Sequence, residues 1–234
     1  MYRFRHASTA IRLDVIGLIL AGFINTFLAS FVASVILGAG TPTLQPDIVE
    51  RILWINENSL VWQLGWLFWF AVTLSFSWSY YALGRNLGGV QTWVHLAIGL
   101  AIIAAAVDIL GIIVNMAVLP GLADAYVLNQ DTFLVSVFQS QESLSTALTN
   151  VTAFGIYTFA GLLLLPACFH TPSYPRWIAW LGTVEWGIAT IATVLLIILP
   201  TLATIPLLIS FVLYAPWVWA SAWWILRDTK PVDQ

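Results

Sequence analysis

The sequence predicts an all-α protein, a polytopic membrane bundle of six transmembrane helices that forms a single membrane domain, 1–234. Composition is the first observation behind this prediction: 60% of the residues are hydrophobic and 8% are charged, whereas globular proteins carry roughly 25% charged residues. The second is a series of apolar runs of at least about 18 residues, the length that crosses the hydrocarbon of a bilayer. These runs cover 15–38, 60–83, 93–119, 143–168, 177–199 and 202–226.

The first apolar run, 15–38, follows Arg3, Arg5 and Arg12, as the core of a signal peptide would. It is longer than the roughly 7 to 15 residues of a cleaved signal core. We therefore interpret it as an uncleaved first transmembrane helix. No long polar segment separates the later runs, so a soluble domain is not expected.

The distribution of Lys and Arg predicts that both termini are cytoplasmic, because short cytoplasmic loops are enriched in these residues. All of the cationic residues except one flank helix ends on the same side: Arg3, Arg5, Arg12, Arg85, Arg176, Arg227 and Lys230. The exception is Arg51, in the first outer loop. There we expect a local ion pair with Asp47 or Glu50.

The two long outer loops are expected to contain short interfacial helices. In the first loop Ile48, Ile52 and Ile55 have helical spacing, which favours an amphipathic helix lying on the membrane surface. The second loop, 121–141, combines acidic residues with the apolar run 133–138 and is expected to form another interfacial piece. Together these segments would cap the outer mouth of the bundle.

Asp108 is the most informative residue, because it lies within the third apolar run, 93–119. A charged group at this depth costs about 2.5–3.5 kcal/mol on insertion scales and is a functional candidate by default. A helical projection places it on a face of small residues, which suits helix packing. The other members of that face are Ala97, Ala101, Ala104, Ala105, Gly111 and Asn115.

Three other helices are expected to turn polar faces inward. Glu185 shares its face with Gly182, Ala189 and Ala192, at a depth within about two turns of Asp108. The first helix contributes Asp14, Ala21 and Asn25. The fourth contributes Gln139, Ser143, Thr146, Asn150, Tyr157 and Gly161. We expect these groups to converge on a polar interior.

Both buried carboxyls are expected to be protonated at rest, because no Lys or Arg lies within the spans and burial disfavours the charged form. The candidates for binding a ligand or a proton are Asp108, Glu185, Asn115, Asn150, Tyr157, Asn25 and Trp186. The competing interpretation is that neutral Asp108 and Glu185 only hold helices together through hydrogen bonds, each worth about 0.6–2 kcal/mol.

Most of the 13 tryptophans are explained by the aromatic belts at membrane interfaces. Four lie deeper and could line a pocket: Trp66, Trp69, Trp186 and Trp217. Such a pocket would suit a lipid, a quinone, a carotenoid or a cation. The sequence identifies no cofactor.

Several chemistries are disfavoured. The single lysine, Lys230, follows the last helix, so a retinal Schiff base inside the bundle is excluded. His95 and His170 lie near helix ends, away from the polar faces, and Cys168 is the only cysteine. No metal or haem site is therefore predicted. A net charge of −3 spread over both sides gives no indication of nucleic-acid binding.

The leading functional prediction is a membrane protein whose polar interior binds or translocates a small ligand or a proton, alone or as a subunit of a larger membrane complex. The second is a membrane-embedded acid/base enzyme acting on an isoprenoid or lipid, in which Asp108 and Glu185 exchange protons with the substrate. The third is a structural accessory subunit. In each case the bilayer is the immediate partner, and a hydrophobic small molecule is expected in the first two.

The segment Pro175–Gly182, at the entry to the fifth helix, resembles the proline-arginine-x-leucine-glycine-x-leucine entry of a widespread family of bacterial six-helix membrane proteins. The chain differs from that pattern at Ile178 and Ala179. The family is known only as a domain of unknown function. The resemblance implies the six-helix architecture and a multi-pass location in a bacterial-type inner (plasma) membrane, and it implies no activity or site residues.

Overall fold

The structure, a computed structural model, describes residues 9–42, 44–88 and 90–228. Three of the cationic residues used to predict the orientation, Arg3, Arg5 and Lys230, lie outside these ranges. Within them the secondary structure is helical throughout and contains no strand.

Six helices are long and apolar enough to cross a membrane, which confirms the predicted number. Their bounds are Thr9–Ile36, Ser59–Asn86, Gln91–Asn129, Thr132–His170, Arg176–Ile198 and Pro200–Asp228. Each begins within about a dozen residues of its expected start. This pattern fits a multi-pass integral membrane protein.

Several of the long helices contain wider, π-helical turns, denoted η. In chain order the elements are α2 (Thr9–Phe23), η1 (Ile24–Leu28), α3 (Ala29–Phe31), η2 (Val32–Ile36), the 3₁₀ turn η3 (Gly38–Gly40), α4 (Ile48–Glu57), α5 (Ser59–Asn86), α6 (Gln91–Ile113), η4 (Val114–Val118), α7 (Leu119–Asn129), α8 (Thr132–Thr146), η5 (Ala147–Ala153), α9 (Phe154–His170), α10 (Arg176–Ile198) and α11 (Pro200–Asp228).

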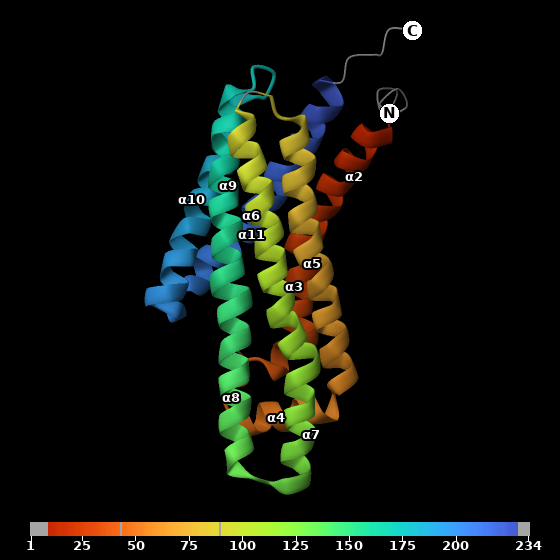
Figure 1. Cartoon of the computed structure of the whole chain (residues 1–234), viewed down its shortest axis with the longest axis vertical. Coiled ribbons are helices and arrows are strands. Elements are labelled where there is room, and N and C mark those ends of the chain that lie inside the picture. The colour runs from red at the N-terminus through yellow and green to blue at the C-terminus, as the bar shows by residue number, and fades with distance from the viewer. Residues whose placement is uncertain (1–8, 43, 89, 229–234) are drawn as a thin grey trace.

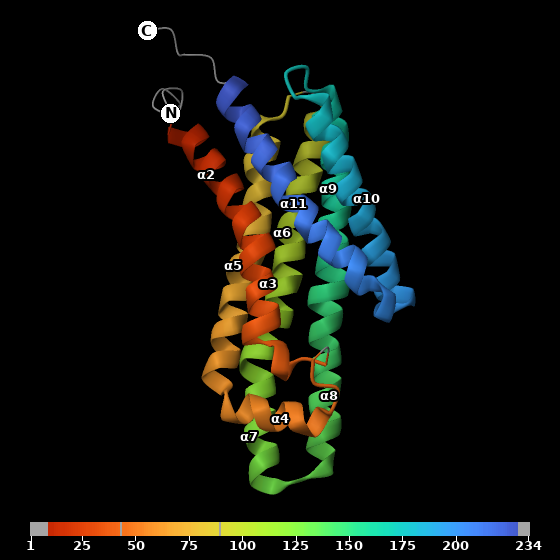
Figure 2. The ribbon, with the colours of Figure 1, turned by 180° about the vertical axis from the view of Figure 1, so that it is seen from behind.

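The bundle is built around α6, which packs between α5 and α9. On the far side α11 crosses the bundle obliquely and packs against α2 and α10 (Figure 2). The α10–α11 pair leans away from the other helices towards its connecting turn (Figure 1). Helix α11 also contributes Leu207 and Phe211 to the pocket described below.

Helix α6 turns its predicted face inward. All seven residues of that face are buried, including Asp108 and Asn115, whereas Ile102 and Ile103 are more than half exposed. The prediction of the buried face is confirmed. Small residues allow α5 and α9 to approach closely, and branched aliphatic residues face outward, where lipid would solvate them.

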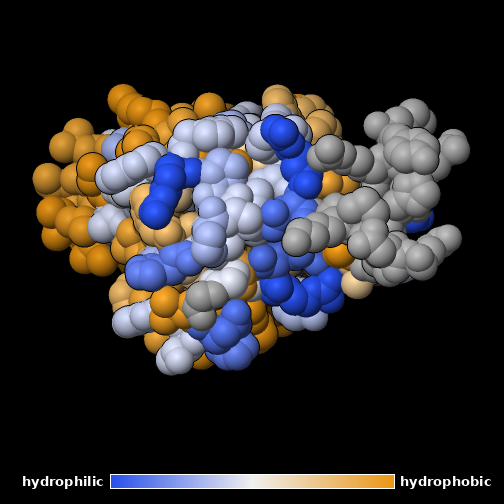
Figure 3. Space-filling model, turned by 90° about the horizontal axis from the view of Figure 1, so that it is seen from above, coloured by the Kyte–Doolittle hydropathy of each residue, from blue (hydrophilic) through white to orange (hydrophobic). Residues whose placement is uncertain are grey.

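The outer surface of the bundle is strongly apolar, with Ile205 as the extreme at 70% exposure. Viewed from the end where α2 begins and α11 ends, hydrophilic residues gather in the middle, and hydrophobic residues cover the side towards which α10 leans (Figure 3). A protein in water rarely exposes apolar patches of this extent. The surface therefore suits a lipid environment.

The second outer connection differs from the expectation of a separate interfacial piece. Helices α7 and α8 continue α6 and α9 as a helical hairpin that extends beyond the rest of the bundle (Figure 1). Each continuous helix has 39 residues, or about 58 Å at 1.5 Å per residue, against about 30 Å of hydrocarbon. The hairpin forms because Ala123 and Phe138 are buried together in a core shared with α4.

The first outer loop does form the predicted helix, α4, which lies across the hairpin (Figures 1 and 2). Asp47 caps its N-terminus by accepting from the backbone N–H groups of Val49 and Glu50. Ile52 and Ile55 are fully buried in the shared core, as the amphipathic pattern implies. Its location at a membrane surface remains a prediction.

The predicted local ion pair of Arg51 is wrong. Arg51 Nε donates to Glu142 Oε1 at 3.0 Å, and its Nη2 donates to Oε2 at 2.7 Å, so the pair is bidentate. Its Nη1 donates to the backbone carbonyls of Gln45 and Pro46. Asp47 is engaged in the cap, and folding brings Glu142 of α8 against α4. The pair therefore ties α4 to the hairpin.

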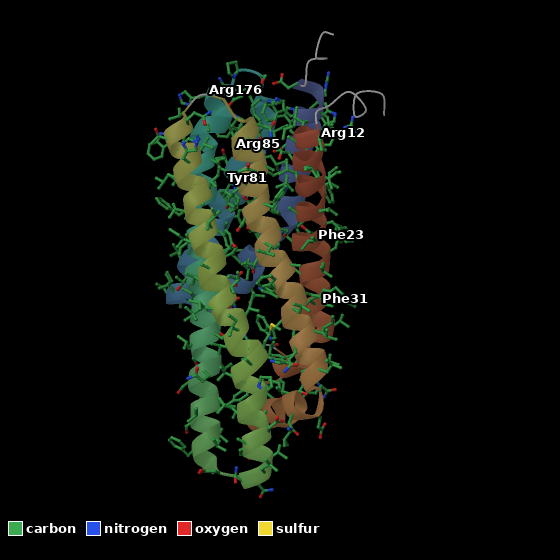
Figure 4. All side chains as sticks on the ribbon, turned by 45° about the vertical axis from the view of Figure 1, so that its right-hand side comes forward. Arg12, Phe23, Phe31, Tyr81, Arg85 and Arg176 are labelled. Atoms are coloured by element: carbon green, nitrogen blue, oxygen red, sulfur yellow. The ribbon has the colours of Figure 1, made fainter. Side chains whose placement is uncertain are left out.

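Basic residues gather at the opposite end, where Arg12, Arg85 and Arg176 lie (Figure 4). Asp14, on the inward face of α2, accepts there from Arg85 Nη2 at 2.7 Å and from Asn86 Nδ2 at 2.8 Å. This contact satisfies a carboxylate that is almost completely buried, and it fastens the first helix to α5.

Candidate functional site

Three of the predicted site residues, Asp108, Asn150 and Tyr157, line one pocket, which we name the Asp108 pocket. Its volume is about 80 Å³. A single water molecule needs roughly 10–15 Å³ of such space. The pocket therefore has room for several waters or for a small chemical group. Its other lining residues are Trp69, Val72, Phe76, Thr149, Phe154, Leu207 and Phe211.

Asp108 is 6% exposed, and only one of its two carboxyl oxygens has a hydrogen-bond partner. Thr73 Oγ1 donates to Asp108 Oδ2 at 2.5 Å, and the same hydroxyl lies 3.3 Å from the carbonyl oxygen of Trp69. Asp108 Oδ1 is buried without a hydrogen-bond partner. A buried polar atom without a partner costs roughly 1–3 kcal/mol, so a ligand that contacts this oxygen would recover that free energy.

Asn150 lies within the wide turn η5, which precedes α9. Before this turn Phe138 and Ser145 are buried while Ser143 and Thr146 are exposed, so the predicted inward face of this helix is wrong on that side. After the turn Tyr157 and Gly161 are buried as predicted. A π-helical turn accommodates an extra residue and rotates the buried face, which a projection with a constant period of 3.6 residues cannot represent.

Asn25 and Asn115 lie in two other wide turns and are not among the residues that line the pocket. Asn25 Nδ2 donates to the carbonyl of Ala21 at 2.8 Å, and Asn115 Nδ2 donates to the carbonyl of Gly111 at 3.2 Å. Each acceptor is four residues earlier in the same helix. Each amide also donates to a serine of a neighbouring helix, Asn25 to Ser75 Oγ at 2.7 Å and Asn115 to Ser145 Oγ. These amides therefore link their own helices to α5 and α8.

Glu185 and Trp186 lie in a separate part of the core. Ser210 Oγ donates to Glu185 Oε1 at 3.1 Å, Oε2 has no partner, and the residue is 1% exposed. The hydroxyl groups of Tyr80 and Tyr214 lie close enough to Glu185 to interact with it electrostatically. Glu185 is not among the residues that line the Asp108 pocket.

An aromatic cluster lies between the two carboxyls. Its members are Phe76, Tyr80, Tyr157, Trp186, Tyr214 and Trp217. Phe76 stacks on Tyr157 with 5.0 Å between ring centroids, on the side of Asp108. At the other side Trp186 meets Tyr80 at 5.8 Å. Aromatic rings thus pack beside each of the two carboxyls, and of the two only Asp108 lines the pocket.

The four deep tryptophans have different positions. Trp69 lines the pocket, and Trp66 packs edge-on against it with 6.1 Å between ring centroids. Trp186 and Trp217 are fully buried in the aromatic cluster. Only Trp69 thus has the role that the sequence suggested for this group.

Several residues of the site were not predicted from the sequence, among them Thr73, Leu207 and Phe211. Thr73 could have been noticed, since a hydroxyl residue within the apolar part of the second span indicates a polar contact inside the bundle. Leu207 and Phe211 had no such signal, because apolar residues in a transmembrane helix are equally consistent with contacting lipid. Their role depends on how α11 crosses the bundle.

Among the described residues no group of three or more His, Cys, Asp and Glu side chains is placed to hold a metal ion. No family model, no curated protein and no solved structure matches the chain. The chemistry of the Asp108 pocket itself is what points to a function.

Proposed function

We propose that this integral membrane protein binds a small lipid-soluble molecule in the Asp108 pocket. The observation that carries the proposal is that a buried carboxyl with an unpartnered oxygen lines a pocket whose other walls are mostly apolar. Binding sites for small molecules commonly combine apolar walls with a few polar groups that orient the ligand. Asp108 and Asn150 are these polar groups.

The ligand enters from the side of the bundle. Phe154, Leu207 and Phe211 are each partly exposed, and Asn150 is exposed, so the pocket reaches the apolar outer surface beside α11. Its volume of about 80 Å³ is below the 300–1,000 Å³ typical of a site that encloses a whole drug-sized ligand. The head group therefore occupies the pocket while the rest of the molecule lies along the helices in the bilayer.

Binding is favoured over acid/base catalysis by the separation of the two carboxyls. Asp108 is the one carboxyl among the lining residues, and Glu185 lies beyond the aromatic cluster. General acid/base chemistry on one substrate needs each group within hydrogen-bond reach of it. We further propose that the end bearing Arg12, Arg85 and Arg176 faces the cytoplasm, as the positive-inside rule implies.

We expect Leu207→Trp to block the pocket and Leu208→Trp to leave it open. Leu207 lines the pocket, whereas its neighbour Leu208 is exposed and does not. The probe is a decanol that carries a photoactivatable diazirine, added to the protein in lipid nanodiscs. In the wild type, labelling is expected in peptides containing Phe154 and Phe211, and excess unlabelled decanol should suppress it.

Leu207→Trp should weaken the displaceable labelling about tenfold, which corresponds to about 1.4 kcal/mol. The Leu208→Trp variant should match the wild type. Labelling that unlabelled decanol does not displace, or equal labelling in all three proteins, would contradict the proposed binding function.

A further inference from the structure

We propose that the head group bound by the Asp108 pocket is an organic ammonium cation that carries a lipophilic chain. This inference rests on the proposed binding function and assigns its ligand class. Asp108 is the counter-ion, and the aromatic lining surrounds the positive charge.

The walls of the pocket suit a cation because half of its ten lining residues are aromatic. They are Trp69, Phe76, Phe154, Tyr157 and Phe211. The face of an aromatic ring attracts a positive charge, and cages of such rings bind ammonium groups. An anionic head group would instead be repelled by both the rings and the carboxylate.

The pocket offers a carboxyl but no positive charge of its own. None of its lining residues is basic. The two ion pairs found in the described part of the chain, Arg51–Glu142 and Arg85–Asp14, involve other carboxylates. An unpaired carboxylate in apolar surroundings is costly, so the carboxyl is neutral while the pocket is empty, and a bound ammonium group stabilises its ionised form.

The hydrogen bonding of Asp108 is compatible with such an ion pair. The hydroxyl of Thr73 holds Oδ2, and Oδ1 remains without a donor. The carboxyl torsion of aspartate is broad and roughly two-fold, so a small rotation presents either oxygen to a ligand. An ammonium N–H would supply the missing donor and the missing charge together.

The size of the pocket selects the shape of the cation. A volume of about 80 Å³ accommodates an ammonium head group, and the chain leaves between Phe154, Leu207 and Phe211, all partly exposed. The exposed amide of Asn150 lies at this opening. A single-chain amphiphilic amine therefore fits better than a compact hydrophilic one.

The test measures equilibrium binding of radiolabelled decylammonium to the protein in nanodiscs of zwitterionic phosphatidylcholine, with unlabelled decanol and decanoate as competitors. Decanol has the same chain and a similar head group but no charge, and decanoate reverses the charge. We expect decylammonium to bind at least tenfold more tightly than decanol. Decanoate is expected to compete least.

Three variants separate charge from packing. Asp108→Asn should weaken decylammonium binding at least tenfold and change decanol binding less than twofold. Phe211→Leu keeps an apolar wall but removes a ring. The affinity for decylammonium should therefore fall about two- to fivefold, as expected for a cation–π contact of about 0.5–1 kcal/mol. Glu185→Gln alters the other carboxyl with an unpartnered oxygen and should leave both affinities unchanged.

The outcomes distinguish this inference from the function on which it rests. Equal affinities for decanol and decylammonium, or an Asp108→Asn variant with unchanged cation affinity, would overturn the cation assignment. If Leu207→Trp still weakens both probes in that case, the binding function stands. If neither probe shows saturable binding to the wild type, the binding function and the cation assignment both fail. Selectivity in the wild type decides the question even if Asp108→Asn does not fold.

Discussion

Gly161→Ala is expected to destabilise the protein by about 2 kcal/mol, although alanine is normally the better residue within a helix by about 1 kcal/mol. A Cβ atom at this position of α9 would overlap the indole ring of Trp186. That ring is enclosed by Tyr80, Tyr214 and Trp217, so it has no room to move. Forcing extra volume into a well-packed core costs about 1–3 kcal/mol.

The measurement is the free energy of unfolding in mixed micelles during titration with SDS. The matched control is Gly187→Ala on α10, one residue from Trp186, where a Cβ meets nothing within 4 Å. This variant should gain about 0.5–1 kcal/mol from helix propensity. In a Trp186→Leu background the cost of Gly161→Ala should shrink. An equal effect of the two glycine substitutions would show that the close packing of α9 on Trp186 is wrong.

Arg51→Ala is expected to release α4 from the α7–α8 hairpin, at a cost of about 3 kcal/mol. Removing one partner of a buried ion pair costs about 3–5 kcal/mol, because the other charge is left without compensation. The side chain of Glu142 retains 13% exposure, which places the cost at the low end. Amide hydrogen exchange in α4 should then accelerate about 100-fold, at 1.4 kcal/mol per factor of ten.

Glu50→Ala is the control for this variant, because Glu50 is one of the two local partners expected from the sequence. It is exposed and bonds to Gln45, so its removal should change the exchange in α4 little. Replacing the pair by Arg51→Met and Glu142→Leu together should restore most of the protection, since apolar residues of similar size can substitute for a buried ion pair. Faster exchange after Glu50→Ala than after Arg51→Ala would favour the local pair instead.

The aromatic cluster and the contact between α4 and the α7–α8 hairpin are the two regions that these substitutions loosen. The aromatic cluster around Trp186 separates Asp108 from Glu185, and the α4–hairpin contact holds the ends of α7 and α8, which continue the helices bearing Asp108 and Asn150. Loosening either region should alter the pocket only indirectly. The decanol labelling described above would detect such an effect.

Much of the fold was readable because hydrophobic length and helical period are local properties. The six spans follow from runs of apolar residues, and the inward position of Asp108 follows from the small residues that share its face. The orientation of Asn25 and Asn115 into the bundle was also readable. Their partners, Ser75 on α5 and Ser145 on α8, were not, because contacts between helices depend on how the helices pack.

The six membrane-spanning helices and the buried face that carries Asp108 could be predicted from the sequence, since both features depend on residues close together in one helix. Which groups meet became evident only from the packing of the helices: Arg51 contacts Glu142, 91 residues away, and Asp108 shares one pocket with Asn150, Leu207 and Phe211. The packing also separates Glu185 from Asp108 by the aromatic cluster. The physical reason is that such contacts depend on crossing angles and on the register after each wide turn, which are set by packing between helices.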